Sequence, residues 1–168
     1  VTLVMRRDCF NGDPEAFFDN PASIGIFDNR GVLLTQFGSK GQLLVKYTGN
    51  VTIPTDRFVT ESFCDLSGTS TVCIHEATYT TQITLPFRPG GYFFEYQRCC
   101  RNVPLVNIVN PLETGATWVT HLSEEAMQTC NSSPVFASWT NLFLCAGKPY
   151  KFDHRSIDPD NDSLVYSL

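Results

Sequence analysis

Three aspartates late in the chain stand at alternate positions: Asp158, Asp160 and Asp162. Alternate spacing in a loop aims carboxylates at one hard cation, and Asp153 with a backbone carbonyl would add ligands. The pattern is not an EF-hand, because the sixth position counted from Asp158 is Ser163 instead of glycine. Two interpretations stay open: a calcium site that stiffens the joint between two modules, and a solvated turn that leads into a strand.

Seven cysteines are the next residues whose type carries chemistry: Cys9, Cys64, Cys73, Cys99, Cys100, Cys130 and Cys145. None belongs to a CxxC pair of the metal-binding kind, and only Cys73 has a histidine close to it in the sequence, His75. Disulfides formed in an oxidising compartment are therefore the favoured interpretation. Because the number is odd, at least one cysteine stays outside intramolecular pairs.

The positions of the cysteines suggest which of them pair. Adjacent cysteines at a strand end point to opposite faces, which lets one of them reach the first strand. A pair that closes its own short loop would stabilise the fold by about 2 to 3 kcal/mol. The expected pairs are Cys9 with Cys99 or Cys100, Cys64 with Cys73, and Cys130 with Cys145. A direct bond between the adjacent Cys99 and Cys100 is the alternative.

No catalytic signature is recognisable. A cysteine nucleophile needs a histidine base, but His75, His121 and His154 stand in segments without such a signature. The 17 acidic residues are too many for one pair to be singled out as a glycosidase pair. The sequence therefore predicts a protein that is not an enzyme. Arg98 and Arg101, which flank the adjacent cysteines, suit either a carboxylate ligand or a buried ion pair.

Composition argues against two kinds of partner. The net charge is −5, and the 12 basic residues are scattered, so there is no basic stripe for a nucleic-acid backbone. The apolar runs fall short of the roughly 18 residues that a membrane span requires. A chain of 168 residues with 42% hydrophobic residues has room for one full domain and part of another.

Alternation of apolar and polar residues, typical of strands, dominates the chain. It runs over 79–85 and over 92–97, and the Pro-Gly-Gly run between them predicts a β-hairpin. A second hairpin is predicted at 24–34, where the sequence DNRG at 28–31 suits a tight turn. Further strands are expected at 1–6, 43–48, 116–122, 141–145 and 150–153.

One short helix is expected after Ser123, which can cap it, because Glu124 and Glu125 suit the positive end of the helix dipole. The turn-forming run at 130–134 then marks a boundary. We expect an all-β protein of Ig-like or cadherin-like β-sandwich modules in series, stabilised by disulfides. The first module covers 1–130, and a second begins at 131–168. A sandwich needs about seven strands, so further chain or a neighbouring protomer would complete the second one.

Several segments together resemble the N-terminal region of giant gliding-motility-associated adhesins, cell-surface proteins that Bacteroidota export by type IX secretion. The aspartate loop and the residues after it also resemble the calcium-loop-into-strand signature of cadherin-like domains. The adhesin family usually has glycine in that loop, where this chain has Asn161. The matching segments are RRDC at 6–9, DNPASIGIFD at 19–28, PGGY at 89–92, YQRCCRN at 96–102, NIVNP at 107–111, NSSPVF at 131–136 and FDHRSIDPDNDSLVY at 152–166.

The resemblance implies an extracellular, non-enzymatic adhesive or structural module that serves surface attachment or gliding motility. Its partners would be other modules of the same chain, neighbouring protomers and an extracellular surface or glycan. It also implies a possible O-glycosylation acceptor at Ser163, within Asp162-Ser163-Leu164. The alternative is a subunit of an extracellular filament, in which strands exchanged between protomers complete the open sandwich.

Overall fold

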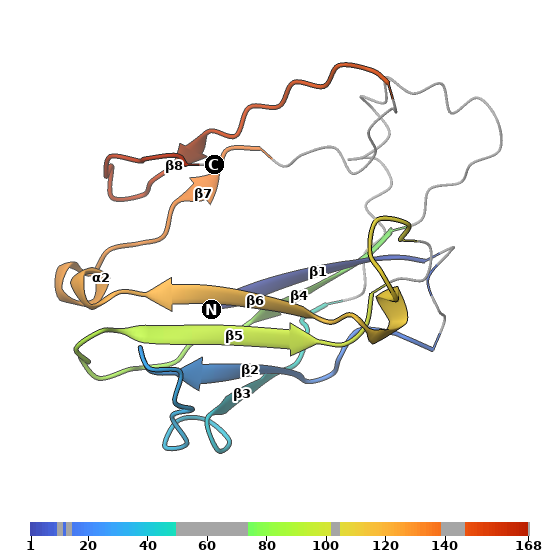
Figure 1. Ribbon diagram of the computed structural model, residues 1–168. Coiled ribbons are helices and arrows are strands. Elements are labelled where there is room, and N and C mark those ends of the chain that lie inside the picture. The colour runs from blue at the N-terminus through green and yellow to red at the C-terminus, as the bar shows by residue number, and fades with distance from the viewer. Residues whose placement is uncertain (10–11, 13–14, 50–73, 102–104, 139–146, 168) are drawn as a thin grey trace.

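The computed structural model describes residues 1–9, 12, 15–49, 74–101, 105–138 and 147–167, and strands dominate it (Figure 1). None of its helices is long and apolar enough to span a membrane, as far as the described residues go. The strands are β1 (Thr2–Asp8), β2 (Ala22–Phe27), β3 (Gln42–Val45), β4 (Ile74–Thr80), β5 (Tyr92–Arg98), β6 (Ala116–Leu122), β7 (Val135–Phe136) and β8 (Ser156–Ile157). The helices are the 3-10 turn η1 (Pro111–Glu113) and the short α2 (Glu124–Thr129).

The strands form three antiparallel sheets. Four strands in the order β3-β2-β5-β6 make the largest, β1 and β4 make a second, and β7 and β8 make a short third. The all-β expectation is therefore confirmed. In Figure 1 the β1–β4 pair lies against the four-stranded sheet, and the β7–β8 ribbon stands apart above β6.

The core lies between the first two sheets and follows from the period-two pattern of their strands. On β5 the alternate residues Tyr92, Phe94 and Tyr96 are buried, and on the adjacent strand β2 Ile24 and Ile26 lie beside them on the same face of the sheet. The β1–β4 pair covers this face with Ala77 and Tyr79, and with the partly buried Leu3 and Met5. The apolar face of each sheet is thus buried by the other.

The predicted hairpin between 79–85 and 92–97 is wrong. Strand β4 ends at Thr80 and pairs over its full length with β1, from Thr2 opposite Thr80 to Asp8 opposite Ile74. Strand β5 instead lies between β2 and β6 in the other sheet. The connection of eleven residues between β4 and β5 is too long for a tight hairpin, and it carries the chain from one sheet to the other.

The predicted turn at 28–31 is present, and a short hairpin closes around it. The amide of Asp28 donates to the Val32 carbonyl at 3.0 Å, and Gly31 supplies the positive φ of 76° that such a turn favours. Phe27 pairs with Leu33 across the hairpin, and the Leu34 amide donates to the Ile26 carbonyl at 2.8 Å. The chain then loops on, and β3 becomes the hydrogen-bonded partner of β2.

The predicted helix is confirmed as α2. The Ser123 hydroxyl accepts a hydrogen bond from the Ala126 amide at 3.0 Å, and Glu124 and Glu125 occupy the first turn. The strand expected at 150–153 is absent, and β8 forms only at Ser156–Ile157, opposite β7. The strand expected at 141–145 lies outside the described residues. The division into modules at residue 130 stays a prediction.

Candidate functional site

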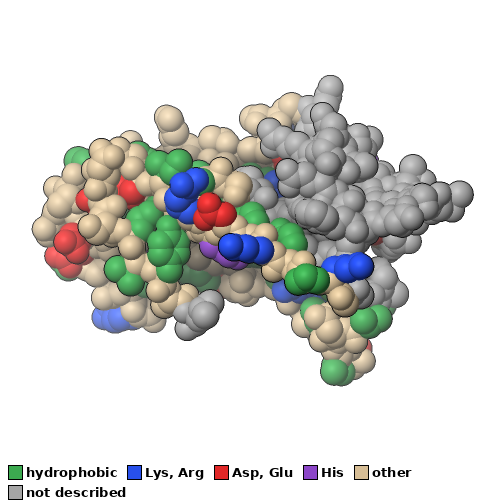
Figure 2. Space-filling view, turned by 90° about the horizontal axis from the view of Figure 1, so that it is seen from above, with side chains coloured by type: hydrophobic (Ala, Val, Ile, Leu, Met, Phe, Trp, Pro, Cys, Tyr) green, Lys and Arg blue, Asp and Glu red, His purple; other side chains and the backbone are tan. Residues whose placement is uncertain are grey.

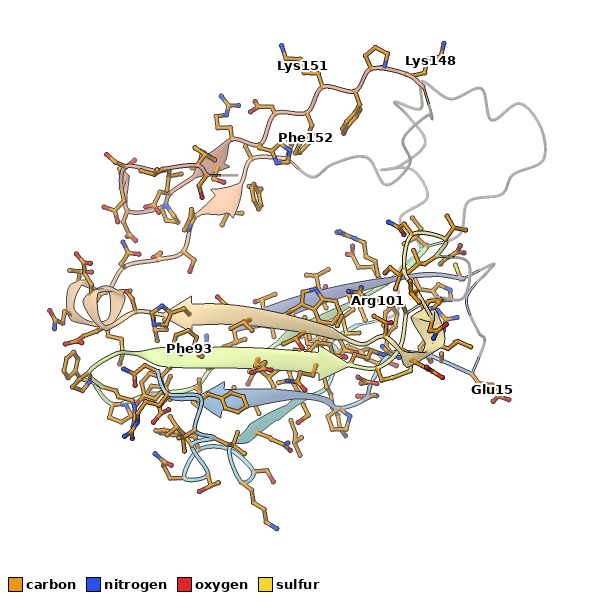
Figure 3. All side chains as sticks on the ribbon, in the orientation of Figure 1. Glu15, Phe93, Arg101, Lys148, Lys151 and Phe152 are labelled. Atoms are coloured by element: carbon orange, nitrogen blue, oxygen red, sulfur yellow. A yellow bond between two sulfur atoms is a disulfide. The ribbon has the colours of Figure 1, made fainter. Side chains whose placement is uncertain are left out.

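An arginine-lined cleft lies where β5 ends and β6 begins. It has a volume of about 420 Å³. Figure 3 shows Arg101 at this end of the molecule, beside η1. The described residues that line the cleft are Met5, Arg6, Arg7, Asp8, Gly12, Ala16, Phe18, Arg98, Cys99, Cys100, Arg101, Leu105, Leu112, Ala116 and Trp118.

Strand pairing brings these residues together from distant parts of the sequence. Arg6 and Arg7 stand near the end of β1, while Arg98 is the last residue of β5. The β5–β6 register sets Arg98 opposite Ala116 and Tyr96 opposite Trp118. Directly opposed residues share one face of a sheet, so Trp118 lies on the core side of β6, where its side chain is still 49% exposed.

Hydrogen bonds or ion pairs hold Arg6, Arg7 and Arg98. Arg6 Nε donates to Glu76 Oε2 at 2.7 Å. Arg98 lies 3.8 Å from Asp19 Oδ1 and donates to the Phe17 carbonyl. Arg7 donates to the Ala16 carbonyl at 2.9 Å. The contacts of Arg7 and Arg98 hold these two guanidinium groups against the loop that precedes β2, whereas Arg6 is held against β4.

Arg101 differs from the other three arginines. Its guanidinium carbon lies 5.8 Å from the centre of the Trp118 ring, a cation–π contact. Its Nε is buried and has no hydrogen-bond partner, and no ion pair joins Arg101 to any described carboxylate. A buried donor without an acceptor costs free energy that a suitable acceptor would recover. Arg101 is therefore the part of the cleft whose bonding capacity is unmet.

A disulfide joins Cys99 to Cys100 on the rim of the cleft, and the Cα atoms of the two residues are 3.3 Å apart. The expected disulfide between Cys9 and one of these two cysteines is therefore wrong, because Cys99 and Cys100 are bonded to each other. Cys9 is itself disulfide-bonded. The alternative of a direct Cys99–Cys100 bond is the one that the structure contains.

The pairing expected between Cys130 and Cys145 is also not found. Cys130 is an exposed free cysteine that ends α2 in a left-handed conformation, with φ of 56°. Its place at the helix end turns the chain toward β7. Cys64, Cys73 and Cys145 lie outside the described residues, so the expected Cys64–Cys73 pair stays a prediction.

Two buried tyrosines bind Asp19, the aspartate beside Arg98. The Tyr96 hydroxyl donates to Asp19 Oδ2 at 2.5 Å, and the Tyr79 hydroxyl donates to the Asp19 carbonyl at 2.7 Å. Burial, followed by the hydrogen bond to Asp19, raises the pKa of Tyr96 well above its ordinary value. Burial also raises the pKa of Tyr79. Both hydroxyls stay protonated donors that hold the loop before β2 against the two sheets.

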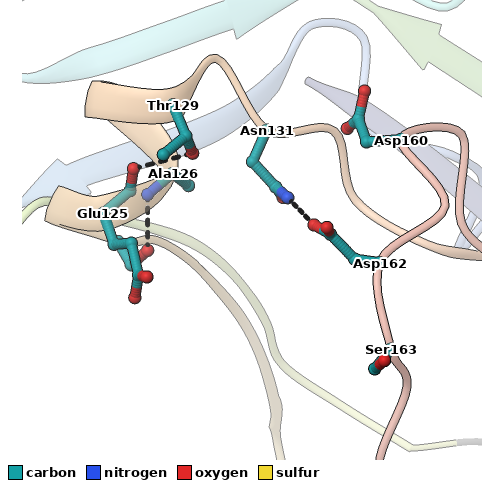
Figure 4. Close-up of a pocket in the computed structure, with 8 residues that line it drawn as sticks. Glu125, Ala126, Thr129, Asn131, Asp160, Asp162 and Ser163 are labelled. Atoms are coloured by element: carbon teal, nitrogen blue, oxygen red, sulfur yellow. Dashed lines mark hydrogen bonds between the residues drawn. The ribbon is translucent and has the colours of Figure 1, made fainter.

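The predicted aspartate site is a hydrogen-bonded turn in the structure. Asp158 Oδ1 accepts from the amides of Asp160 and Asp162 at 2.8 and 3.3 Å, and Asn161 supplies a positive φ of 61°. Asp162 accepts from the Asn131 side chain (Figure 4). The Ser132 amide donates to Asp160.

Each aspartate of this turn thus has its own hydrogen-bond partner, and the carboxylates do not converge on one point. Asp153, the fourth expected ligand, accepts from the Arg155 amide at 3.0 Å. Within the described ranges no group of three or more metal-binding side chains converges. The four aspartates as placed thus do not fit a cation, and calcium stays a prediction of the sequence. Ser163 lines the shallow hollow between α2 and the turn and is exposed.

The three histidines contact aromatic rings. His121 stacks on Phe93 with ring centres 4.2 Å apart, His75 meets Phe17 at 5.8 Å, and His154 meets Phe152 at 4.6 Å. Figure 3 places Phe93 and Phe152 on different parts of the molecule, away from Arg101. None of these histidines lines the arginine cleft.

Some residues of the cleft escaped the sequence analysis. Trp118 carries no motif, and its role depends on the β5–β6 register, which places it opposite Tyr96. Arg6 and Arg7 were noted only as part of a matching segment, although a double arginine at a strand end is a usable signal. Comparisons with family models, with curated proteins and with solved structures find no match for this chain.

Proposed function

We propose that the chain is a non-catalytic adhesive module of an extracellular protein, which binds its target through the arginine-lined cleft. The observation that carries the proposal is the make-up of that cleft. Its described lining combines guanidinium groups with apolar side chains, and contains no histidine that could act as a base. Its two cysteines are joined to each other, so neither offers a thiolate nucleophile.

An extracellular location is supported by cysteine chemistry. Cys9, Cys99 and Cys100 are all disulfide-bonded, and disulfides persist in oxidising surroundings and are rare in reducing ones. The surface is compatible with this: the face in Figure 2 mixes hydrophobic, positive and negative side chains without a large patch of one sign. Such a surface gives no electrostatic footprint for nucleic acid.

Serial β-sandwich modules of the Ig-like or cadherin-like kind would suit mechanical display. The two-sheet core and the separate β7–β8 ribbon support this arrangement. Hydrogen bonds from Asn131 and Ser132 to the aspartate turn brace the segment that links α2 to β7. A braced link would hold neighbouring modules at a fixed angle while load is carried along the chain.

Attachment is the activity to measure. Beads coated with the chain, disulfides intact, should resist detachment by flow from surfaces that the source cells colonise. Beads coated with reduced and alkylated chain serve as the control. The soluble chain should also compete with the cells for the same surface. Equal detachment of both kinds of bead, together with no competition, would overturn the proposal.

A filament subunit is the second candidate, and β6 is the observation that favours it. This strand forms one edge of the four-stranded sheet, and five of its seven residues are exposed. An exposed edge offers unpaired backbone groups to an incoming strand. Concentration-dependent assembly, seen by light scattering and electron microscopy, would favour the filament. A monomer at all concentrations would favour the adhesive module.

A further inference from the structure

We propose that the arginine-lined cleft binds a monocarboxylate with an apolar body, and that Arg101 is the residue that anchors the carboxylate. The proposal rests on the proposed adhesive function and deepens it, because it names the chemical group that the target presents. Neither a free acid nor a chain terminus is excluded by this chemistry, since both offer one carboxylate on an apolar frame.

The unmet bonding capacity of Arg101 identifies the anchor. Its Nε is buried without an acceptor, while its guanidinium plane is held near the Trp118 ring. A guanidinium fork binds a carboxylate through two parallel N–H donors, Nε and one Nη. A bound carboxylate would give Nε the acceptor that it lacks. The backbone amide of Arg101 is already fixed, because it donates to the Pro111 carbonyl at 2.7 Å.

The charges in the cleft favour a ligand with a single negative charge. Four arginines line the cleft. Among the described residues, three carboxylates lie in or beside the lining: Asp8 is part of it, Glu76 is paired with Arg6, and Asp19 lies beside Arg98. Within the described part of the chain, no ion pair joins Arg101 to a carboxylate, so its positive charge faces the cleft without a counter-charge from these residues. A monoanion neutralises this charge, whereas a phosphate dianion would bring an excess negative charge into a partly desolvated site.

The remaining walls select an apolar body. Seven of the described lining side chains are apolar or aromatic: Met5, Ala16, Phe18, Leu105, Leu112, Ala116 and Trp118. The cleft volume of about 420 Å³ lies in the range of small-molecule sites. Small-molecule sites usually have mostly apolar walls and a few polar or charged groups that orient the ligand. A highly hydroxylated ligand would leave many of its polar groups facing apolar walls.

Calorimetric titration of the full chain with phenylacetate tests the proposal. Phenylacetamide is the matched neutral probe, because it keeps the shape and removes the charge. Inorganic phosphate tests the competing anion class, and N-acetylphenylalanine tests a chain terminus as the source. We expect saturable binding of phenylacetate and at least about tenfold weaker binding of phenylacetamide, since a hydrogen bond to a charged group is lost. If phenylacetate binds more tightly than N-acetylphenylalanine, the source is a free acid, and if it binds less tightly, the source is a chain terminus.

The variants Arg101→Gln and Arg101→Lys locate the binding. Arg101→Gln should weaken phenylacetate binding at least about tenfold, and Arg101→Lys, which keeps the charge but loses the fork, should weaken it less. Arg155→Gln is the matched control, because Arg155 is 70% exposed and lies outside the cleft lining. It should bind as the wild type does. If Arg101→Gln does not fold, Arg101→Lys decides.

Three results would overturn the proposal: equal binding of phenylacetate and phenylacetamide, preferential binding of phosphate, or unchanged binding by the Arg101 variants. The titration separates this failure from failure of the adhesive function. Coated beads that hold to surfaces while phenylacetate does not bind would leave adhesion standing. Phenylacetate binding without bead attachment would leave a ligand site on a protein that is not an adhesin.

Discussion

The hydroxyl of Tyr96 donates a hydrogen bond to Oδ2 of Asp19 at 2.5 Å, and so ties the central strand β5 to the loop that precedes β2. The same aspartate lies 3.8 Å from Arg98, which lines the cleft. Tyr79, from the opposite sheet, reaches the backbone of Asp19 as well. One residue thus couples both sheets to the wall of the candidate binding site.

Replacing Tyr96 by phenylalanine should destabilise the fold by about 1 to 2 kcal/mol, because a hydrogen bond to a charged acceptor is lost while the ring stays in the core. The midpoint of urea unfolding measures the change. Tyr47→Phe is the control, since the Tyr47 ring meets Tyr79 edge-on and its hydroxyl makes no hydrogen bond to a described residue. Equal midpoints for Tyr96→Phe and the wild type would show that this hydrogen bond contributes nothing.

Alkaline pH should destabilise the protein through the same tyrosines. The folded-state pKa values of Tyr96 and Tyr79 are raised, chiefly by burial. Their contribution is therefore complete below the unfolded pKa of about 10, and is lost as the pH rises above it. Unfolding midpoints measured between pH 8 and pH 11 should fall steeply at the upper end. The unfolding midpoint of Tyr96→Phe should fall less steeply over this pH range. A parallel decline of the midpoints of both proteins would count against assigning the effect to Tyr96.

Acid should weaken the turn after β2 through Asp28, which is only 2% exposed. Hydrogen bonds from the amides of Val32 and Arg30, with the Arg30 charge, lower the pKa of Asp28 against the opposing effect of burial. Arg88 also donates to Oδ2 at 3.1 Å. The stability from this carboxylate is present above its unfolded pKa of about 4, and is lost as the pH falls through the lower folded value.

The variant Asp28→Asn should remove this part of the acid dependence, because asparagine does not titrate. Unfolding midpoints between pH 6 and pH 2 compare it with the wild type, and Asp153→Asn is the control at an exposed position. A curve for Asp28→Asn that declines in parallel with the wild type would assign the acid dependence to other groups.

Thiol labelling should separate the described cysteines into two classes. In the native, unreduced protein a maleimide should modify Cys130, which is exposed and free, and leave Cys99 and Cys100 unmodified because they are joined to each other. Peptide mapping by mass spectrometry identifies the modified positions, and Cys130→Ser should lose the label from that peptide. Labelled Cys99 or Cys100 without reductant would contradict the disulfide.

Calcium gives a prediction of its own, because the sequence and the geometry differ on it. If calcium rigidifies the joint, chelation with EDTA should lower the melting temperature, and Asp160→Asn should remove that response. In the structure the carboxylate of Asp158 accepts hydrogen bonds from two backbone amides, and that of Asp160 accepts one from another. An unchanged melting temperature after chelation would leave this loop as a turn held by its own hydrogen bonds.

Local signals in the sequence predicted well wherever short-range chemistry decides the structure. Ser123 followed by two glutamates predicted α2, and alternation predicted β6 from Ala116 to Leu122. Alternation does not name a partner strand, however. The hairpin between 79–85 and 92–97 was therefore predicted wrongly, since pairing of β4 with β1 depends on a contact across some 70 residues that no local pattern records.

The candidate site was predicted only in part. Arg98 and Arg101 were noted because they flank two cysteines, but the cleft also needs β1 and Trp118, which meet them only through sheet register. The aspartates were singled out by spacing alone. Spacing places carboxylates near one another, but the backbone amides of the same turn compete for them, as they do at Asp158.

The most direct test of the central claim, an extracellular adhesive module, is antibody labelling of intact cells that carry the protein. Antibodies raised against the 168-residue chain should label intact and permeabilised cells equally, and protease added outside should remove the signal. A cytoplasmic protein detected in parallel controls for leakage. Labelling that appears only after permeabilisation, and that resists external protease, would contradict the account.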